Sequence, residues 1–124
     1  MKKISKIVLI LFFVIIVLIG IWFSLDKTTR CNLIYGKNIC NFYAMLDIAS
    51  SNPSISDFDK MISLCSEMEN VPKKDSCFEL VAETFAGIDN TKAKEACDEI
   101  KEIKDEVENV VHKKEDCFNK IQKQ

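Results

Sequence analysis

The apolar run at residues 7–25, IVLILFFVIIVLIGIWFSL, constrains this chain more than any other feature. Seventeen of its nineteen residues are apolar, and the exceptions are Gly20 and Ser24. As a helix that rises about 1.5 Å per residue, the run measures roughly 28 Å, which is close to the ~30 Å hydrocarbon core of a bilayer. Backbone polar groups in lipid must pair within their own segment, and a helix achieves this. The run therefore predicts a transmembrane helix over residues 7–25.

A cleaved signal peptide is the alternative interpretation of this run. Signal peptides usually have an apolar region of about 7–15 residues that ends in small residues at the cleavage site. The run here is longer, and its best-placed small residues, Gly20 and Ser24, are separated by Ile-Trp-Phe. We therefore favour an uncleaved signal anchor that acts as a simple tether, and the sequence leaves cleavage open.

Charge divides the chain shortly after the run. Residues 1–30 contain five bases against one acid, a net charge of +4, whereas residues 31–124 contain twelve bases against eighteen acids, a net charge of −6. The acidic second part excludes a basic nucleic-acid binder. Lys2, Lys3 and Lys6 precede the apolar run, and Lys27, Arg30 and Lys37 follow it closely, so the positive-inside rule leaves the orientation undecided.

The cysteines decide the orientation that the lysines leave open. Such a density of cysteine is typical of an oxidising compartment. We therefore expect residues 1–6 in the cytoplasm, 7–25 in the cell membrane as a single-pass signal anchor, 26–30 as a short linker and 31–124 as an extracytoplasmic domain. All six cysteines lie in that domain: Cys31, Cys40, Cys65, Cys77, Cys97 and Cys117.

Helical periodicity runs through the second part of the chain. Apolar residues recur at every third or fourth position in residues 33–50, 54–69 and 73–87, which is typical of helices with one buried face. Residues 33–50 are the richest in apolar groups and predict a more buried helix. Ser54 and Ser56 are candidate N-caps. No alternating stretch is long enough for a strand, so the sequence predicts an all-α fold.

An internal repeat places the cysteines at equivalent positions. Residues 73–78, KKDSCF, match residues 113–118, KKEDCF, and residues 65–68, CSEM, resemble residues 97–100, CDEI. A degenerate copy covers residues 31–42. Each copy begins with a cysteine, has an apolar residue three positions later, and ends in a second cysteine that opens another helix. The repeat predicts a series of helical hairpins.

One disulfide within each hairpin is the pairing that the repeat favours. Two antiparallel helices that leave one turn bring such cysteines to the same height, within the Cα separation of about 5.5–6 Å that a disulfide needs. Each closure would stabilise the fold by about 2–4 kcal/mol in the chain-entropy model. Six cysteines allow fifteen connectivities, so the repeat favours this pairing without proving it: Cys31–Cys40, Cys65–Cys77 and Cys97–Cys117.

The third pair faces a competing pattern. Positions that step by three and four from Ala93 to Ile121 are apolar except at Lys114, with no Gly or Pro between them, which is typical of one long helix. On such a helix Cys97 and Cys117 would lie about 30 Å apart and could not bond. A hairpin that turns near residues 105–109 would bring them together. We favour the hairpin because the copies end alike, and the single long helix remains the alternative.

Cysteine chemistry beyond structural disulfides is not expected. Zinc sites place cysteine ligands about two to four residues apart, whereas 8, 11 and 19 residues separate the paired cysteines here. The Cys-x-x-Cys motif of thiol–disulfide catalysis is missing, and His112, the one histidine, lies among charged residues without a nucleophile motif. We therefore predict no cofactor, no metal site and no catalytic residue.

The pattern Cys-x-x-[apolar] followed by Lys-Lys-[acid]-x-Cys-Phe-x-x-[apolar]-Ala resembles short helical repeats of uncharacterised archaeal membrane-anchored proteins. The likeness covers residues 31–121, most clearly 65–82 and 97–121. It implies a disulfide-braced helical module outside the membrane, and it implies no activity, substrate or catalytic residue.

These observations predict a non-enzymatic protein with a single N-terminal transmembrane helix and a small disulfide-stapled helical-hairpin repeat domain. Its expected role is to bind another extracytoplasmic or membrane protein or to support envelope structure. An accessory subunit of a membrane enzyme or secretion complex, whose span packs against partners, is the alternative. An enzyme with an unrecognised site is a third hypothesis, and it would need a concave pocket with convergent acids. Neither the partner nor the oligomeric state follows from the sequence.

Overall fold

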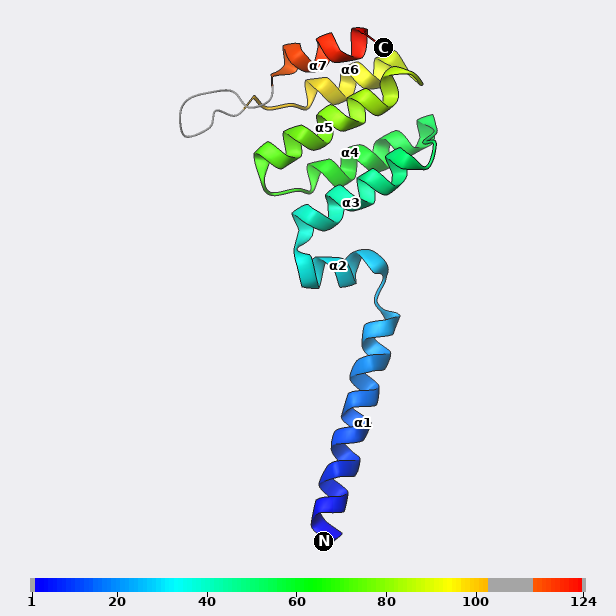
Figure 1. The fold of residues 1–124 in the computed structure, drawn as a ribbon, viewed down its shortest axis with the longest axis vertical. Helices are drawn as coiled ribbons and strands as arrows, with labels where there is room; N and C mark the ends of the chain where they lie inside the picture. The colour runs from blue at the N-terminus through cyan, green and yellow to red at the C-terminus, as the bar shows by residue number, and fades with distance from the viewer. Residues whose placement is uncertain (1, 103–112, 124) are drawn as a thin grey trace.

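The computed structural model describes residues 2–102 and 113–123, with the side chains of residues 2–5 and 28 left out, and these residues form helices without a strand among them (Figure 1). This confirms the predicted all-α class. The elements in chain order are α1 (Lys2–Ser24), α2 (Lys27–Tyr35), α3 (Lys37–Ser50), the 3-10 turn η1 (Ile55–Asp57), α4 (Phe58–Ser66), α5 (Val71–Ala86), α6 (Asn90–Asp98) and α7 (Lys114–Gln122).

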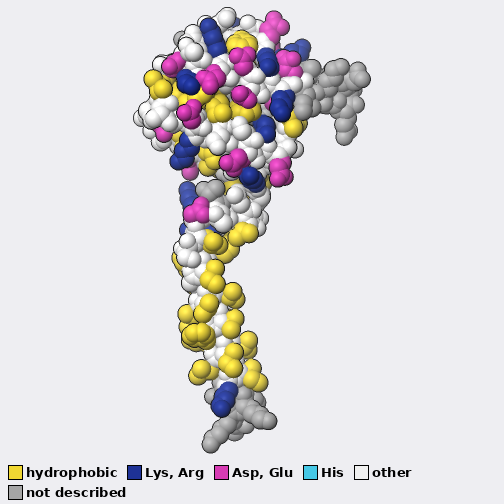
Figure 2. All heavy atoms as spheres, turned by 180° about the vertical axis from the view of Figure 1, so that it is seen from behind, with side chains coloured by type: hydrophobic (Ala, Val, Ile, Leu, Met, Phe, Trp, Pro, Cys, Tyr) yellow, Lys and Arg dark blue, Asp and Glu magenta, His cyan; other side chains and the backbone are white. Residues whose placement is uncertain are grey.

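Helix α1 projects from the rest of the molecule. Within the described residues, Lys6–Ser24 is the one segment long and apolar enough to cross a membrane, and none of it is buried against other parts of the structure. Hydrophobic side chains follow it along its length (Figure 2). This helix coincides closely with the predicted span and is compatible with a membrane anchor. An N-terminal signal sequence can meet the same criterion of length and apolar composition.

The remaining helices form three hairpin units in the described part of the chain. Unit 1 is α2 with α3, unit 2 is α4 with α5, and unit 3 is α6 with α7. One disulfide closes each unit as the repeat predicts, and the Cα atoms are 5.7 Å apart in Cys31–Cys40, 5.5 Å in Cys65–Cys77 and 5.7 Å in Cys97–Cys117. The units are stacked (Figure 1), because the second helix of each unit packs on the first helix of the next, α3 on α4 and α5 on α6.

Unit 3 decides between the hairpin and the single long helix. Helix α6 ends at Asp98 and α7 begins at Lys114, so the long helix is wrong and the hairpin is confirmed. Lys114 holds the two ends together, because its Nζ donates to the carbonyl of Asp98 at 2.7 Å and its backbone N–H donates to the Glu102 carboxylate at 2.8 Å. The predicted turn at residues 105–109 lies outside the described residues, as does His112.

The single buried helix predicted over residues 33–50 is wrong. Helix α2 ends at Tyr35 and α3 begins at Lys37, because Gly36 between them has a φ of +84°, a conformation in which glycine carries no steric penalty. Apolar composition here does not indicate burial throughout, since the last residues of α2 are exposed. The predicted linker 26–30 supplies the start of α2, with Asp26 as its N-cap.

Of the two predicted N-caps, Ser54 is the N-cap of the turn η1, whereas Ser56 lies inside that turn. The backbone N–H of Ser54 donates to the Asp57 carboxylate at 2.9 Å, and the Ser54 hydroxyl donates to it at 2.8 Å. These hydrogen bonds, the backbone one foremost, lower the pKa of Asp57 below its ordinary value. The turn η1 that follows leads directly into α4.

The core lies around the second and third disulfides. Cys65, Cys77, Cys97 and Cys117 are 0–1% exposed, whereas Cys31 is half-buried. The rings of two core residues meet edge to face with centroids 5.1 Å apart, an arrangement that aromatic pairs prefer. The largest apolar side chains packed with these disulfides are Met45, Phe58, Met61, Met68, Phe78, Val81, Phe85 and Ile100, and the edge-to-face pair is Phe58 with Phe85.

We predict that Cys31–Cys40 is reduced before the other two disulfides. Reductant can reach the half-buried Cys31 in the folded protein, whereas the other two bonds are inaccessible until the core opens. Stepwise reduction of the full chain in detergent, with alkylation and mass spectrometry at each step, should show a species alkylated only at Cys31 and Cys40. Earlier loss of Cys65–Cys77, or free thiols before any reduction, would contradict the pairing and its burial.

Candidate functional site

A polar side chain two residues before the second cysteine of a unit binds the backbone of the next unit. In unit 1, Asn38 Oδ1 accepts hydrogen bonds from the N–H groups of Glu69 at 2.7 Å and Asn70 at 3.2 Å. In unit 2, Asp75 Oδ1 accepts from the N–H of Lys101 at 3.0 Å. Glu69 and Lys101 each lie four residues after the first cysteine of their unit. The same link therefore joins unit 1 to unit 2 and unit 2 to unit 3.

Sequence reasoning missed this inter-unit link. The signal is present in the repeat, because Asn38, Asp75 and Glu115 occupy the same position, two residues before Cys40, Cys77 and Cys117. All three side chains carry an acceptor oxygen at a helix start. Asp75 is buried and Glu115 is exposed, which follows from the order of the stack, because within the described residues no unit follows unit 3.

The far end of the stack is polar. Helix α7 packs on α5, where Lys120 forms ion pairs with Glu79 and with Glu83, the latter at 3.4 Å. The hydrogen bond with Glu79 is the main cause that raises the pKa of Lys120 above its ordinary value. The remaining outer residues of α7 are exposed and polar: Glu115, Asp116, Asn119 and Gln122. Repeat stacks typically end on such a surface.

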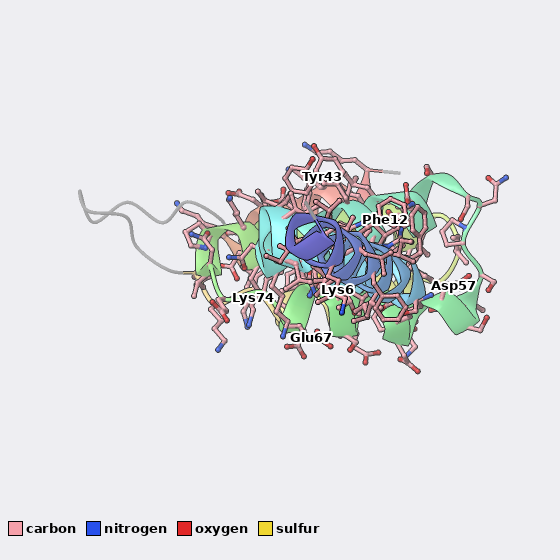
Figure 3. The ribbon with its side chains drawn as sticks, turned by 90° about the horizontal axis from the view of Figure 1, so that it is seen from below. Lys6, Phe12, Tyr43, Asp57, Glu67 and Lys74 are labelled. Atoms are coloured by element: carbon pink, nitrogen blue, oxygen red, sulfur yellow. A yellow bond between two sulfur atoms is a disulfide. The ribbon has the colours of Figure 1, made fainter. Side chains whose placement is uncertain are left out.

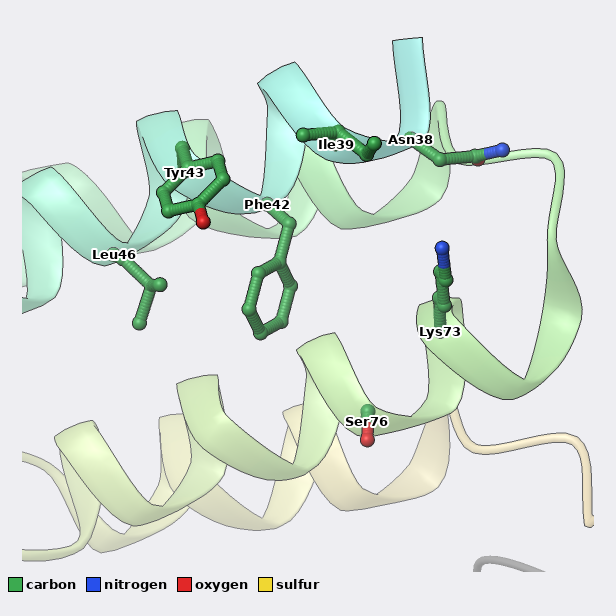
Figure 4. A pocket seen from close by; sticks show the side chains of 7 residues that line it. All are labelled: Asn38, Ile39, Phe42, Tyr43, Leu46, Lys73 and Ser76. Atoms are coloured by element: carbon green, nitrogen blue, oxygen red, sulfur yellow. The ribbon is translucent and has the colours of Figure 1, made fainter. Parts of the chain in front are cut away.

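A groove opens between α3 and α5, the second helices of units 1 and 2 (Figure 4). Its volume is about 390 Å³. The side chain of Phe42 points from α3 toward α5, and Lys73 points from α5 toward α3 at one end (Figure 4). Ile39 is 40% and Tyr43 is 63% exposed, so the rim of the groove is apolar. The lining residues are Asn38, Ile39, Phe42, Tyr43, Leu46, Lys73 and Ser76.

A second cavity of about 290 Å³ lies between α2 and α3, beside the first disulfide. Tyr43 lines both this cavity and the groove. Lys27 and Asp47 form an exposed ion pair at 3.5 Å along it, and such exposed pairs contribute little to stability. The cavity is therefore a solvated crevice, and the apolar groove is the stronger candidate for binding.

Metal ligands do not gather in the described part of the chain. Among residues 2–102 and 113–123, no three His, Cys, Asp or Glu side chains lie where they could hold a metal ion. The six predicted site residues, Cys31, Cys40, Cys65, Cys77, Cys97 and Cys117, are all in disulfides. The absence of a cofactor and of catalytic residues stays a prediction.

No family model, curated protein or solved structure matches this chain. The likeness to repeats of archaeal membrane-anchored proteins therefore stays a prediction.

We predict that Asp75→Ala lowers the free energy of unfolding by about 1–3 kcal/mol, because the N–H of Lys101 loses its acceptor in this partly buried hydrogen bond. Asp75→Asn keeps an acceptor oxygen and should lose less. Glu115→Ala is the matched control, since it removes the equivalent side chain where that side chain is exposed, and we expect a change within about 0.5 kcal/mol. Urea unfolding followed by circular dichroism measures all three. Equal losses at positions 75 and 115 would refute the link.

Proposed function

We propose that this protein is a membrane-tethered module that presents the groove between α3 and α5 to another extracytoplasmic or membrane protein and performs no catalysis. The exposed apolar groove, held on a disulfide-braced stack, is the observation that carries this proposal. Stacked helical pairs commonly offer extended surfaces to partners. A groove on a braced scaffold also binds at a smaller cost in ordering than a flexible segment does.

The lining of the groove indicates the chemistry of the partner. Ile39, Phe42 and Tyr43 suit apolar side chains that project from one face of a helix, a common mode of recognition in grooves. Lys73 is the one charged residue among the lining residues, and it favours a carboxylate at that end. We therefore propose a partner segment with apolar anchors and an adjacent acidic residue.

The membrane placement rests on α1 and on the disulfides together. A fully exposed apolar helix of this length suits lipid, and three disulfides suit an oxidising compartment. Both support residues 1–6 in the cytoplasm and residues 31–124 outside. In the accessory-subunit alternative, α1 itself packs against partner helices, so an exchanged span separates the two hypotheses.

We expect a photoreactive amino acid at Tyr43 to crosslink one partner in native membranes. A probe at Ile88, an exposed apolar residue outside the groove, is the matched control. Ile39→Asp should lower the yield about tenfold, which corresponds to about 1.4 kcal/mol of binding, and Lys73→Glu should lower it several-fold. An unrelated apolar span in place of residues 7–25 should leave the yield unchanged.

Two outcomes of this experiment contradict the proposal. The same adduct from Ile88, with full yield from Ile39→Asp, would show that the groove is not the contact. Loss of the adduct only when the span is exchanged would support the accessory-subunit alternative. Correct disulfides in each variant, checked by mass spectrometry, separate these outcomes from misfolding.

Orientation has its own test. In intact cells, a membrane-impermeant reductant followed by an impermeant maleimide should label Cys31 and Cys40. A Ser5→Cys variant supplies the matched control, because its thiol should be labelled only after permeabilisation. The reverse pattern, with Ser5→Cys labelled in intact cells, would place the stack in the cytoplasm.

A further inference from the structure

The two ends of the stack differ in polarity. The outer side of α7 is polar, as described above, whereas the last three residues of α2 are apolar and exposed: Leu33 by 67%, Ile34 by 57% and Tyr35 by 64%. Apolar side chains that are exposed together usually mark a surface that a membrane or another molecule covers. The end that carries it is the end that continues into α1.

The repeat allows a comparison at equivalent positions. Leu33 lies two residues and Tyr35 lies four residues after the first cysteine of unit 1. The residues at these positions in the other units are charged and exposed: Glu67 and Glu69 in unit 2, and Glu99 and Lys101 in unit 3. Units 2 and 3 thus have charged residues at the positions where unit 1 has Leu33 and Tyr35. This difference indicates that these positions face water in units 2 and 3 and a less polar environment in unit 1.

Ile34 extends the comparison to the buried position of the repeat. Its equivalents, Met68 and Ile100, are buried in the core, and the second helix of the preceding unit packs on each of these units. Unit 1 has α1 before it instead of a hairpin. The protein therefore supplies no cover for Ile34 within the described residues.

The connection to α1 limits how far α2 can lie from a membrane. Two residues separate Ser24, the end of α1, from Lys27, the start of α2. An extended chain covers at most about 3.6 Å per residue, so α2 begins within roughly 11 Å of the end of the span. The headgroup layer on each side of the hydrocarbon core is about 5–8 Å thick. The first residue of α2 therefore cannot lie far above it.

The figures agree with this placement. Helix α2 crosses above the end of α1 (Figure 1), and hydrophobic side chains continue from α1 to the foot of the stack (Figure 2). Seen from below, along α1, the stack extends to both sides of that helix (Figure 3). The underside of the stack thus faces in the direction from which α1 arrives.

We propose that α2 lies in the headgroup layer of the same bilayer, with Leu33, Ile34 and Tyr35 inserted beside the upper acyl chains. This inference rests on the membrane anchoring proposed above. Tyr is typical of membrane interfaces, where its ring contacts chains and its hydroxyl contacts water. Lys27 begins α2 and Lys37 follows it. Both are exposed and form exposed ion pairs, with Asp47 and with Glu67, and such pairs are weak enough for these ammonium groups to contact lipid phosphates instead. Because the connection to α1 is short, a lipid surface is the partner that we assign to these three residues, in preference to a protein.

Tryptophan fluorescence tests the proposal without a new cysteine, since Trp22 is the one tryptophan of the chain. The reporter is Tyr35→Trp in a Trp22→Phe background, and the matched control is Glu69→Trp, the equivalent position of unit 2, in the same background. Each full chain is placed singly in nanodiscs whose lipids carry bromine on the upper acyl chains. The reporter should lose most of its fluorescence and emit at shorter wavelength, whereas the control should keep its fluorescence.

The wild-type chain separates failure of this inference from failure of the anchor. If bromine leaves Trp22 unquenched, α1 is not inserted and the membrane tether itself is wrong. If Trp22 is quenched and the reporter is not, α2 lies outside the lipid and the inference is overturned. If iodide also fails to quench that reporter, a protein or a second copy of the chain, and not lipid, covers it. Leu33→Trp is the second reporter if Tyr35→Trp fails to form its disulfides.

Discussion

The disulfide that ties the two helices of each unit is the constraint on which the rest of the stack depends. Helices α2, α4, α6 and α7 have nine residues each, and isolated helices shorter than about 12–15 residues are marginal in water. A loop closure worth about 2–4 kcal/mol in the chain-entropy model favours each hairpin before it packs. The cysteines of units 2 and 3 then become part of the core, so the covalent bond and the buried apolar surface stabilise the same contacts.

The stack also needs an order, and the polar link between units provides it. A disulfide holds one hairpin together but does not determine the position of the next hairpin. Asn38 and Asp75 determine that position, because each accepts a hydrogen bond from a backbone N–H in the loop that follows α4 or α6. The groove is a consequence of this order, since it lies where α3 and α5 come side by side.

The sequence predicted those features that local spacing determines. The all-α class, the pairing of the cysteines and the hairpin of unit 3 follow from periodicity and from copies that end alike. The apolar stripe from Ala93 to Ile121 favours one long helix, and the copies that end alike correctly outweigh it, since α6 ends at Asp98 and α7 begins at Lys114. The apolar content of residues 33–50 predicts one helix, whereas the repeat predicts a second helix near Cys40, and the break at Gly36 agrees with the repeat. No local pattern predicts the groove, because it arises between helices that are separate in the sequence. The inter-unit link is hard to predict from the sequence, because the position two residues before the second cysteine holds Asn, Asp and Glu in the three units.

The groove lies close to α2, the helix that we place at the membrane surface. Tyr43 lines both the crevice beside α2 and the groove beyond α3, so the groove begins one helix away from α2. Packed helices lie about 8–10 Å apart. With α2 in the headgroup layer, the groove therefore opens roughly one helix diameter above the lipid. A partner that binds there must bring its acidic and apolar segment close to the bilayer surface, which favours a second membrane protein over a freely diffusing one.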